Sequence, residues 1–209
     1  VENRPGGVFI PALRDLTSSA ADGHTLLMIS TSNVVTQPIH PDYPFDLRKM
    51  TPVTEVASGP LILVARKGLP VKTLGDLIEH VKKNPDKVSF GSGGGTGSSF
   101  YLATELLKMK TGIRPVQVPY KGAAPAVADV VAGHVDFMTA SYGSAVAFLK
   151  SGKLRGLAIS GEKREPAFPD MPTLAELGHE ALSADTWIAL FAPAGTPRPI
   201  VQQWSDAIA

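Results

Sequence analysis

Cysteine is absent from the 209-residue chain. Its absence excludes disulfide bonds, thiol nucleophiles and metal sites built on cysteine. No run of 18 or more apolar residues occurs, so the sequence predicts no transmembrane helix. Neither sign of charge dominates, because 20 Lys and Arg face 19 Asp and Glu and the formal net charge is +1. Such a balance gives no broad field to attract nucleic acid or an anionic membrane.

Motifs of catalysis are missing as well. The five histidines are scattered without the paired spacing of a metal site, and no G-x-S-x-G nucleophile elbow occurs. Asp129 and Asp136 are assigned to a helix face and a strand start, and nothing pairs a nucleophile with a base. The sequence therefore indicates binding without chemistry: no enzyme, no cofactor and no metal.

Short apolar runs alternate with amphipathic segments along the chain. Residues 25–29 and 60–68 are typical of buried strands, and the polar residues 30–33 are expected to form a loop at the carboxyl end of the first. Leu74, Leu77, Ile78 and Val81 lie on one face of a predicted helix that has Thr73 as a possible N-cap. We expect residues 40–58 to be irregular and residues 171–178 to form a short helix. The repeated strand–helix alternation predicts an α/β fold with mostly parallel sheets and helices on both sides.

The segment GSGGGTGSS, residues 91–99, follows a predicted strand and opens a predicted helix that Gly112 is expected to end. Glycines allow close approach, and a helix start offers unpaired N–H groups with the positive end of the dipole, which suits an anion. Thr96, Ser98 and Ser99 add hydroxyl donors. No Lys completes a P-loop, and no acidic residue about 20 positions later completes a dinucleotide fingerprint. A simple tight corner remains the alternative.

Two further loops are expected at the same sheet edge. In PYKGAAPAVADVVAG, Gly122 and small alanines open a helix, and Lys121 either adds charge or is merely solvated. In TASYGSA, Ser141 and Ser144 are possible donors, although Ser144 is equally suited to capping the next helix. The aromatic side chain of Trp187 is more typical of a core position than of the wall of a ligand-binding pocket.

Several segments, in this order, carry a family resemblance: VENRPG, DGHTLLM, SFGSGGGTGSSFYLATELLK, VPYKGAAPAVADVVAGHVDFM, MPTLAELG and FAPAGTPRPIV. The chain resembles the Bug-type receptors, which are extracytoplasmic solute-binding proteins of tripartite tricarboxylate transporters. The resemblance covers nearly all 209 residues.

The resemblance implies a two-lobed periplasmic-binding-protein-like fold of type II, with lobes joined by two crossing strands. One lobe would hold residues 1–65 and 185–209, and the other residues 66–184. It implies a periplasmic monomer that captures a small mono- or dicarboxylate and delivers it to membrane transporter subunits, without nucleic acid. The implied ligand-binding residues are Thr31, Ser32, Asn33, Gly94, Gly95, Thr96, Gly97, Ser98, Ser99, Tyr120, Lys121, Gly122, Ala123 and Ala124. Ser141 and Trp187 complete the predicted set on the chemistry of their own side chains.

The chain departs from the family pattern in three respects. The strand and Pro/Gly-rich ligand loop that usually precede VENRPG are absent from this sequence, and GGVFIPAL stands where members often continue with more glycines and an Asn. Both ends are typical of cuts, so we expect a fragment with an incomplete first lobe and no signal peptide in this sequence. Ala140 and Ser141 stand where many members carry Asp-Asn, which weakens the case for a ligand with an ammonium group. Two alternatives remain: an effector-sensing domain of a transcription regulator, and an enzyme that uses a phosphate or nucleotide.

Overall fold

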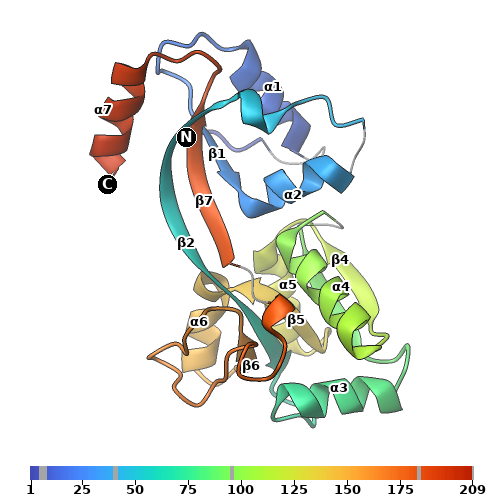
Figure 1. Ribbon diagram of the computed structural model, residues 1–209. Helices are drawn as coiled ribbons and strands as arrows, with labels where there is room; N and C mark the ends of the chain where they lie inside the picture. Colours follow the sequence, from blue (N-terminus) through green and yellow to red (C-terminus); the bar gives the residue numbers. More distant parts are fainter. Residues whose placement is uncertain (5–8, 40–41, 95–96, 183–184, 209) are drawn as a thin grey trace. The chain divides into compact units, whose positions relative to one another are not determined.

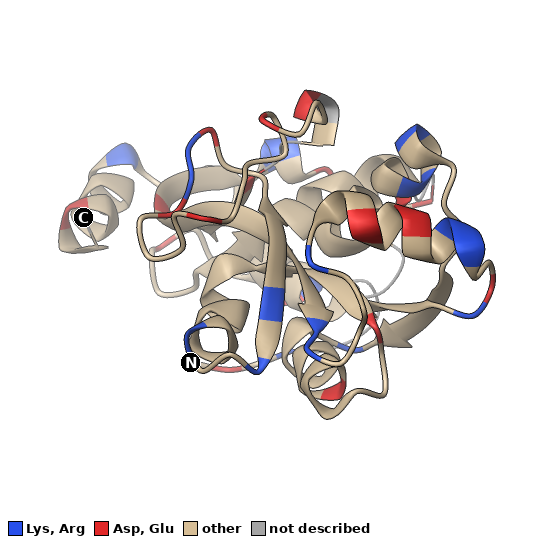
Figure 2. Ribbon diagram, turned by 90° about the horizontal axis from the view of Figure 1, so that it is seen from below, with Lys and Arg blue, Asp and Glu red and all other residues tan. Residues whose placement is uncertain are grey.

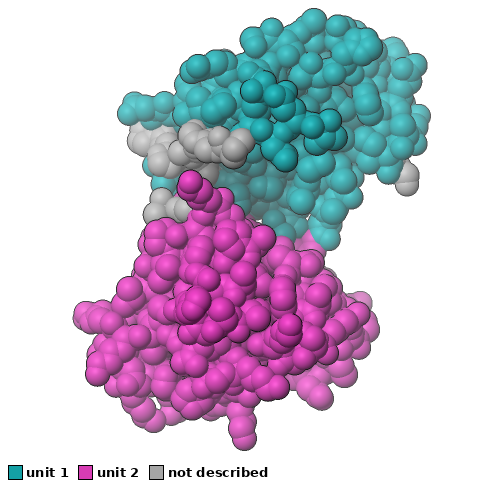
Figure 3. Space-filling model, turned by 180° about the vertical axis from the view of Figure 1, so that it is seen from behind, with its two compact units in different colours: residues 1–58, 186–209 teal, residues 59–185 magenta. Residues whose placement is uncertain are grey.

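The computed structural model describes residues 1–4, 9–39, 42–94, 97–182 and 185–208 (Figure 1). The chain forms two compact units, coloured separately in Figure 3. The first unit comprises Val1–Ser58 and Thr186–Ala209, and the second comprises Gly59–Asp185. The boundaries of the functional lobes, expected between residues 65 and 66 and between residues 184 and 185, stay a prediction.

Helices and strands alternate through most of the chain. In order they are α1 (Ile10–Ser18), β1 (Leu27–Ser30), α2 (Thr31–Ile39), η2 (Leu47–Lys49), β2 (Thr51–Arg66), α3 (Leu74–Lys83), β3 (Ser89–Gly93), α4 (Ser99–Thr111), β4 (Val116–Tyr120), α5 (Ala123–Ala132), β5 (Phe137–Ser141), α6 (Tyr142–Lys150), β6 (Leu154–Ile159), η3 (Glu180–Leu182), β7 (Asp185–Ala192) and α7 (Arg198–Ile208).

The sheet of the second unit is mixed. Strand β3 lies parallel to β4 and β5, as the strand–helix alternation predicts. The end of β2, in contrast, is antiparallel to both β5 and β6, so the expectation of mostly parallel pairing is not fully confirmed. The parallel part is the one that matters for the site, because β3, β4 and β5 all end at the same sheet edge.

Side chains on the two faces of this sheet pack into two separate hydrophobic cores. Helices α3 and α4 cover one face, where Phe90 and Phe137 stack with ring centroids 6.0 Å apart. Helices α5 and α6 cover the other face, where Met138 is fully buried. Because successive strand residues point to opposite faces, a helix layer on each side is needed to bury both sets (Figure 1).

A charged cluster stabilises the opposite end of these strands, where β3 and β5 begin. The Arg66 Nε donates to Asp136 Oδ1 over 2.7 Å. The other carboxylate oxygen of Asp136 accepts from the backbone N–H of Ser89 over 2.8 Å and from its hydroxyl over 3.1 Å. One carboxylate thus joins β2, β3 and the start of β5.

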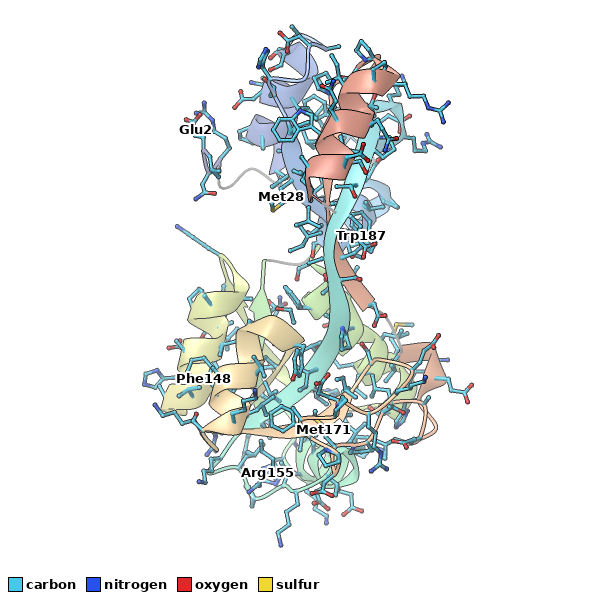
Figure 4. All side chains as sticks on the ribbon, turned by 90° about the vertical axis from the view of Figure 1, so that its left-hand side faces the viewer. Glu2, Met28, Phe148, Arg155, Met171 and Trp187 are labelled. Atoms are coloured by element: carbon cyan, nitrogen blue, oxygen red, sulfur yellow. The ribbon has the colours of Figure 1, made fainter. Side chains whose placement is uncertain are left out.

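The first unit has a smaller core. Strand β1 pairs antiparallel with β7, which neighbours β2. Buried Leu13 and Leu16 of α1 pack with Ile29 of β1 in this core. On the other face of β1, Met28 is 53% exposed and is labelled in Figure 4.

Three local expectations are wrong. Strand β2 begins at Thr51, so half of it lies in the stretch expected to be irregular. The polar residues after β1 form the first turn of α2 and not a loop. Residues 171–178 form turns in place of a helix, and Thr173 makes an isolated parallel bridge to Ile159.

Two local predictions, one for the start of a helix and one for the end of another, are confirmed. Thr73 caps α3 in a capping box with Asp76, and Gly112 ends α4 with a φ of 72°. Among the described residues, no helix is both long and apolar enough to cross a membrane. Figure 2 shows cationic and anionic residues interspersed along the ribbon.

Candidate functional site

Three helices start at one edge of the sheet in the second unit. Strand β3 leads through a glycine-rich loop into α4, β4 leads through Lys121 and Gly122 into α5, and β5 passes directly into α6. Because the three strands are parallel, their carboxyl ends lie side by side. The edge therefore collects the first turns of three helices.

The first two of these connections are in direct backbone contact. Gly93, the last residue of β3, is so close to α5 that a Cβ atom there would lie 2.8 Å from the Ala123 Cα. The next residue, Gly94, has a φ of +90° and donates its N–H to the Tyr120 carbonyl over 3.0 Å. The glycines thus serve close approach between two loops, which a side chain at Gly93 would prevent.

Ser98 is the N-cap of α4. Its Oγ accepts a hydrogen bond from the Tyr101 N–H over 3.2 Å, and the residue is 3% exposed. Ser99 begins the helix and Gly97 precedes the cap, both half-buried. Gly95 and Thr96, also predicted as site residues, lie outside the described residues. The Ser98 oxygen is therefore used locally, as expected of a helix cap.

The start of α5 is arranged differently. Its N-cap is Gly122, and among the described residues no side chain caps it. Ala123 and Ala124 follow in the first turn, and Lys121 is exposed. Small residues leave the first N–H groups of this helix accessible, and the helix dipole favours a negative group there.

Tyr120 connects the two loops through both its backbone and its side chain. Its hydroxyl donates to Asp129 Oδ2 over 2.6 Å, and Asp129 Oδ1 lies 3.3 Å from His134 Nδ1. Burial and the hydrogen bond to Asp129 raise the pKa of Tyr120 to about 12. The hydrogen bonds from Tyr120 and His134 lower the pKa of Asp129. The Tyr120 hydroxyl is thus directed at α5.

At the third connection, Ser141 and Ser144 interact with each other. The Ser141 hydroxyl donates to Ser144 Oγ over 3.0 Å, and the Ser144 hydroxyl donates to the Ser141 carbonyl over 2.8 Å. Ser141 is the N-cap of α6 but makes no side-chain cap within the described residues. Both hydroxyls remain half-buried at the sheet edge.

Four predicted residues belong to the first unit. Thr31 starts α2, and its Oγ1 accepts from the Trp187 N–H over 2.9 Å. Asn33 Oδ1 accepts from the Ser30 N–H over 2.8 Å, and Ser32 is half-buried. Trp187, labelled in Figure 4, is half-buried in β7. Their roles in ligand binding stay predictions.

Two cavities lie away from these loops. A cavity of about 20 Å³ in the second unit is lined largely by leucines, with Thr139 and Ser160. A cavity of about 280 Å³ in the first unit is lined partly by Ser19, Asp46 and Lys49. Neither lining includes a predicted site residue. In the described part of the chain, no group of three or more His, Asp or Glu is placed to hold a metal ion.

Sequence reasoning missed two residues that shape this edge. Gly93 was within the glycine-rich segment, but its contact with Ala123 depends on strand pairing that the sequence does not specify. Asp129 was assigned to a helix face, where it does lie. The spacing of nine residues between Tyr120 and Asp129 was the available signal, since a strand end followed by two helical turns can bring them together.

Comparison with known proteins gives consistent matches over the whole chain. A family model described as "Tripartite tricarboxylate transporter family receptor" matches residues 1–209. The chain is 37% identical over 204 residues to protein BugT of Bordetella pertussis. The matched region covers 96% of this chain and 62% of BugT. It therefore spans less than two thirds of that relative's length.

Two solved structures from Rhodopseudomonas palustris are also similar. MatC with bound malate is 32% identical with a TM-score of 0.90, covering 99% of this chain and 71% of that one. Rpa4515 with adipate is 31% identical with a TM-score of 0.92, covering 100% of this chain and 70% of that one. These matches confirm the predicted α/β fold class.

Proposed function

Because the chain belongs to the tripartite tricarboxylate transporter receptor family, we propose that it binds a small organic carboxylate as part of a solute-binding receptor. Two relatives of known structure were solved with dicarboxylates, malate and adipate. That chemistry agrees with the donors at the carboxyl edge of β3, β4 and β5. The proposed role is capture and delivery of a solute, without catalysis.

The contact between Gly93 and Ala123 is the observation that carries the proposal. It brings the loop before α4 against the uncapped start of α5, and Gly94 is hydrogen-bonded to Tyr120 in the same place. Helix-start N–H groups bind anions without a cationic side chain, since charge-assisted hydrogen bonds to a carboxylate are short and strong. Ordered water can complete such a set.

The proposed ligand is a carboxylate without an ammonium group. Ala140 is fully buried and Ser141 ends β5, so these two positions present no charge to the edge. Asp129 is engaged with Tyr120 and His134. An ammonium group needs a carboxylate or several carbonyl oxygens to replace its hydration, whereas hydroxyls and N–H groups suit an anion.

The wider role follows from the family and is part of the proposal. We place the protein in the periplasm and propose that membrane transporter subunits receive its solute. The two units would act as the two lobes of the receptor. Thr31, Ser32, Asn33 and Trp187 remain proposed contacts of the first unit, and Gly95, Thr96 and Lys121 remain proposed contacts of the second.

Thermal-shift measurements on the 209-residue chain test the binding proposal. Adipate and malate should raise the melting temperature, whereas adipamide, which has the same carbon chain without charge, should not. At 100 times its dissociation constant a ligand stabilises by about 2.7 kcal/mol. For a chain of this size that is a rise of roughly 5–10 °C.

The alternatives have their own outcome in the same experiment. A rise with ATP or inorganic phosphate, together with no response to adipate, malate or other carboxylates, would replace the receptor proposal by a phosphate- or nucleotide-using protein. Isothermal titration calorimetry of any positive compound then gives its stoichiometry and affinity.

A further inference from the structure

Tyr120 and Asp129 close a loop that contains the uncapped start of α5. Tyr120 is the last residue of β4, and Asp129 lies in the second turn of α5. The hydrogen bond of 2.6 Å between them spans Lys121, Gly122 and the first two turns of the helix. The direction in which α5 leaves β4 is therefore fixed by a side-chain contact as well as by the short connection.

The same tyrosine also contacts the glycine-rich loop. Its carbonyl oxygen accepts from the Gly94 N–H over 3.0 Å. Its ring lies along β3, since a Cβ atom on Gly91 would be 3.6 Å from the Tyr120 Cε2. One residue thus touches both loops whose N–H groups belong to the proposed anion site.

Asp129 is itself held from the far end of α5. Its backbone carbonyl accepts from the His134 N–H over 2.9 Å, and its carboxylate lies 3.3 Å from the His134 ring nitrogen. Gly133, with a φ of +87°, turns the chain back so that His134 reaches this position. The carboxylate that receives the Tyr120 hydroxyl is therefore oriented on both of its oxygens.

We propose that Asp129 is a positioning residue of the anion site, acting through Tyr120 to hold the glycine-rich loop and the start of α5 in register. This assignment rests on the proposed function for the identity of the ligand. Asp129 does not touch the ligand. Its effect arises because hydrogen-bond donors must lie within a few tenths of an ångström of their places to act together on one carboxylate.

Removing the contact from either side should loosen the two loops. Tyr120→Phe and Asp129→Ala each delete one partner of the bond, whereas Asp129→Asn keeps an oxygen that can accept from the tyrosine. A hydrogen bond to a charged group is worth roughly a tenfold change in an equilibrium. The Gly94 N–H reports the change directly, because its acceptor is the Tyr120 carbonyl.

The test combines two measurements on the 209-residue chain. Amide exchange of Gly94, measured by NMR without ligand, should accelerate roughly tenfold in Tyr120→Phe and Asp129→Ala. The dissociation constant for adipate should rise by a similar factor. The double variant should be no worse than either single variant, and Asp129→Asn should recover most of both losses.

Two matched variants separate positioning from general destabilisation. Asp136→Ala removes an aspartate at the opposite sheet edge and should lower the melting temperature while leaving Gly94 exchange and adipate affinity near wild type. Tyr142→Phe removes a tyrosine hydroxyl that bonds Glu165 and should leave Gly94 exchange unchanged.

Unchanged Gly94 exchange in both Tyr120→Phe and Asp129→Ala would overturn the positioning role. Strictly additive effects of the two substitutions would overturn it as well. A wild-type chain that binds neither adipate nor malate, but whose Gly94 exchange responds as expected, would refute the carboxylate assignment and leave the coupling between Asp129 and the two loops in place.

Discussion

The substitution Gly93→Ala tests the contact on which the site depends. Gly93 is buried at the end of β3, and an added methyl group would meet three backbone atoms of the α5 start. The methyl carbon would lie 2.8 Å from the Ala123 Cα, 3.0 Å from the Ala123 nitrogen and 3.1 Å from the Gly122 carbonyl carbon. Non-bonded carbon atoms prefer about 3.5–4.0 Å, so the helix start or the strand end must move by several tenths of an ångström.

The size of the effect follows from overpacking. Forcing one extra methyl group into a packed site costs about 1–3 kcal/mol, and backbone neighbours leave no side chain that can swing away. For a chain of this length, the melting temperature should fall by roughly 2–12 °C. The same displacement separates the N–H groups of the two loops, so affinity for adipate or malate should fall by at least about tenfold.

The matched control is Gly91→Ala, two residues earlier on the same face of β3. Its added methyl group would lie 3.6 Å from the Ala126 Cβ, 3.6 Å from the Tyr120 Cε2 and 3.7 Å from the Met138 Cβ, and each of these is an ordinary van der Waals contact. Differential scanning calorimetry and adipate titration of both variants therefore isolate the close approach. If Gly93→Ala melts and binds like Gly91→Ala, the two loops do not touch as described and the argument for a shared site fails.

Four further predictions concern the framework and its titrating groups. Thr73→Ala removes the capping box of α3 and should lower the free energy of unfolding by about 1 kcal/mol, measured by urea titration. The backbone N–H groups of Lys72 and Thr73 lower the pKa of Asp76 in the folded protein. Asp76 therefore stabilises the fold fully at pH values above the ordinary pKa of an aspartate, and this stabilisation is lost as the pH falls through the lowered pKa. Asp76→Asn should reduce this loss of stability at acid pH. Asp136→Ala should destabilise by roughly 2–3 kcal/mol, because it leaves Arg66 and Ser89 without their acceptor, and a loss as small as that of Thr73→Ala would contradict this. Carbon-13 NMR of the tyrosine ring should give Tyr120 a pKa of about 12, and the stability of the fold should fall as the pH rises toward that value. Asp129→Ala should lower the pKa of Tyr120 back toward the ordinary value of 10.0.

Local signals in the sequence were sufficient for much of the second unit. Thr73 followed by Asp76 identified the start of α3, and Gly112 identified the end of α4, because capping depends on neighbours a few positions away. The alternation of strands and helices gave the layers on both sides of the sheet. The order and direction of the strands were not available, since β2 pairs with strands more than 70 positions later.

The misassigned segments share one physical cause. The first half of β2 is mostly exposed or half-buried, so it lacks the apolar run by which buried strands are identified. The Thr-Ser-Asn sequence at the start of α2 contains residues equally typical of caps and loops. The turns at residues 171–178 have a Thr173–Glu176 reciprocal pair typical of a helix start, with hydrogen bonds of 2.8 and 3.1 Å, yet no helix follows. In each case tertiary context decided between local structures of similar energy.

The site shows the same division between local and spatial information. Each loop could be found from its own residues, because Gly, Ser and Ala after an apolar run are typical of a strand that turns into a helix. That the loops belong together depends on Gly93, whose missing side chain admits the Ala123 backbone, and on Tyr120, which bonds to Gly94 and Asp129. A substitution at Ser98 or Ser99 would alter one proposed donor. A change at Gly93 or Tyr120 alters the positions of several donors relative to one another, and for a ligand held by several donors at once that geometry determines affinity more than any one of them.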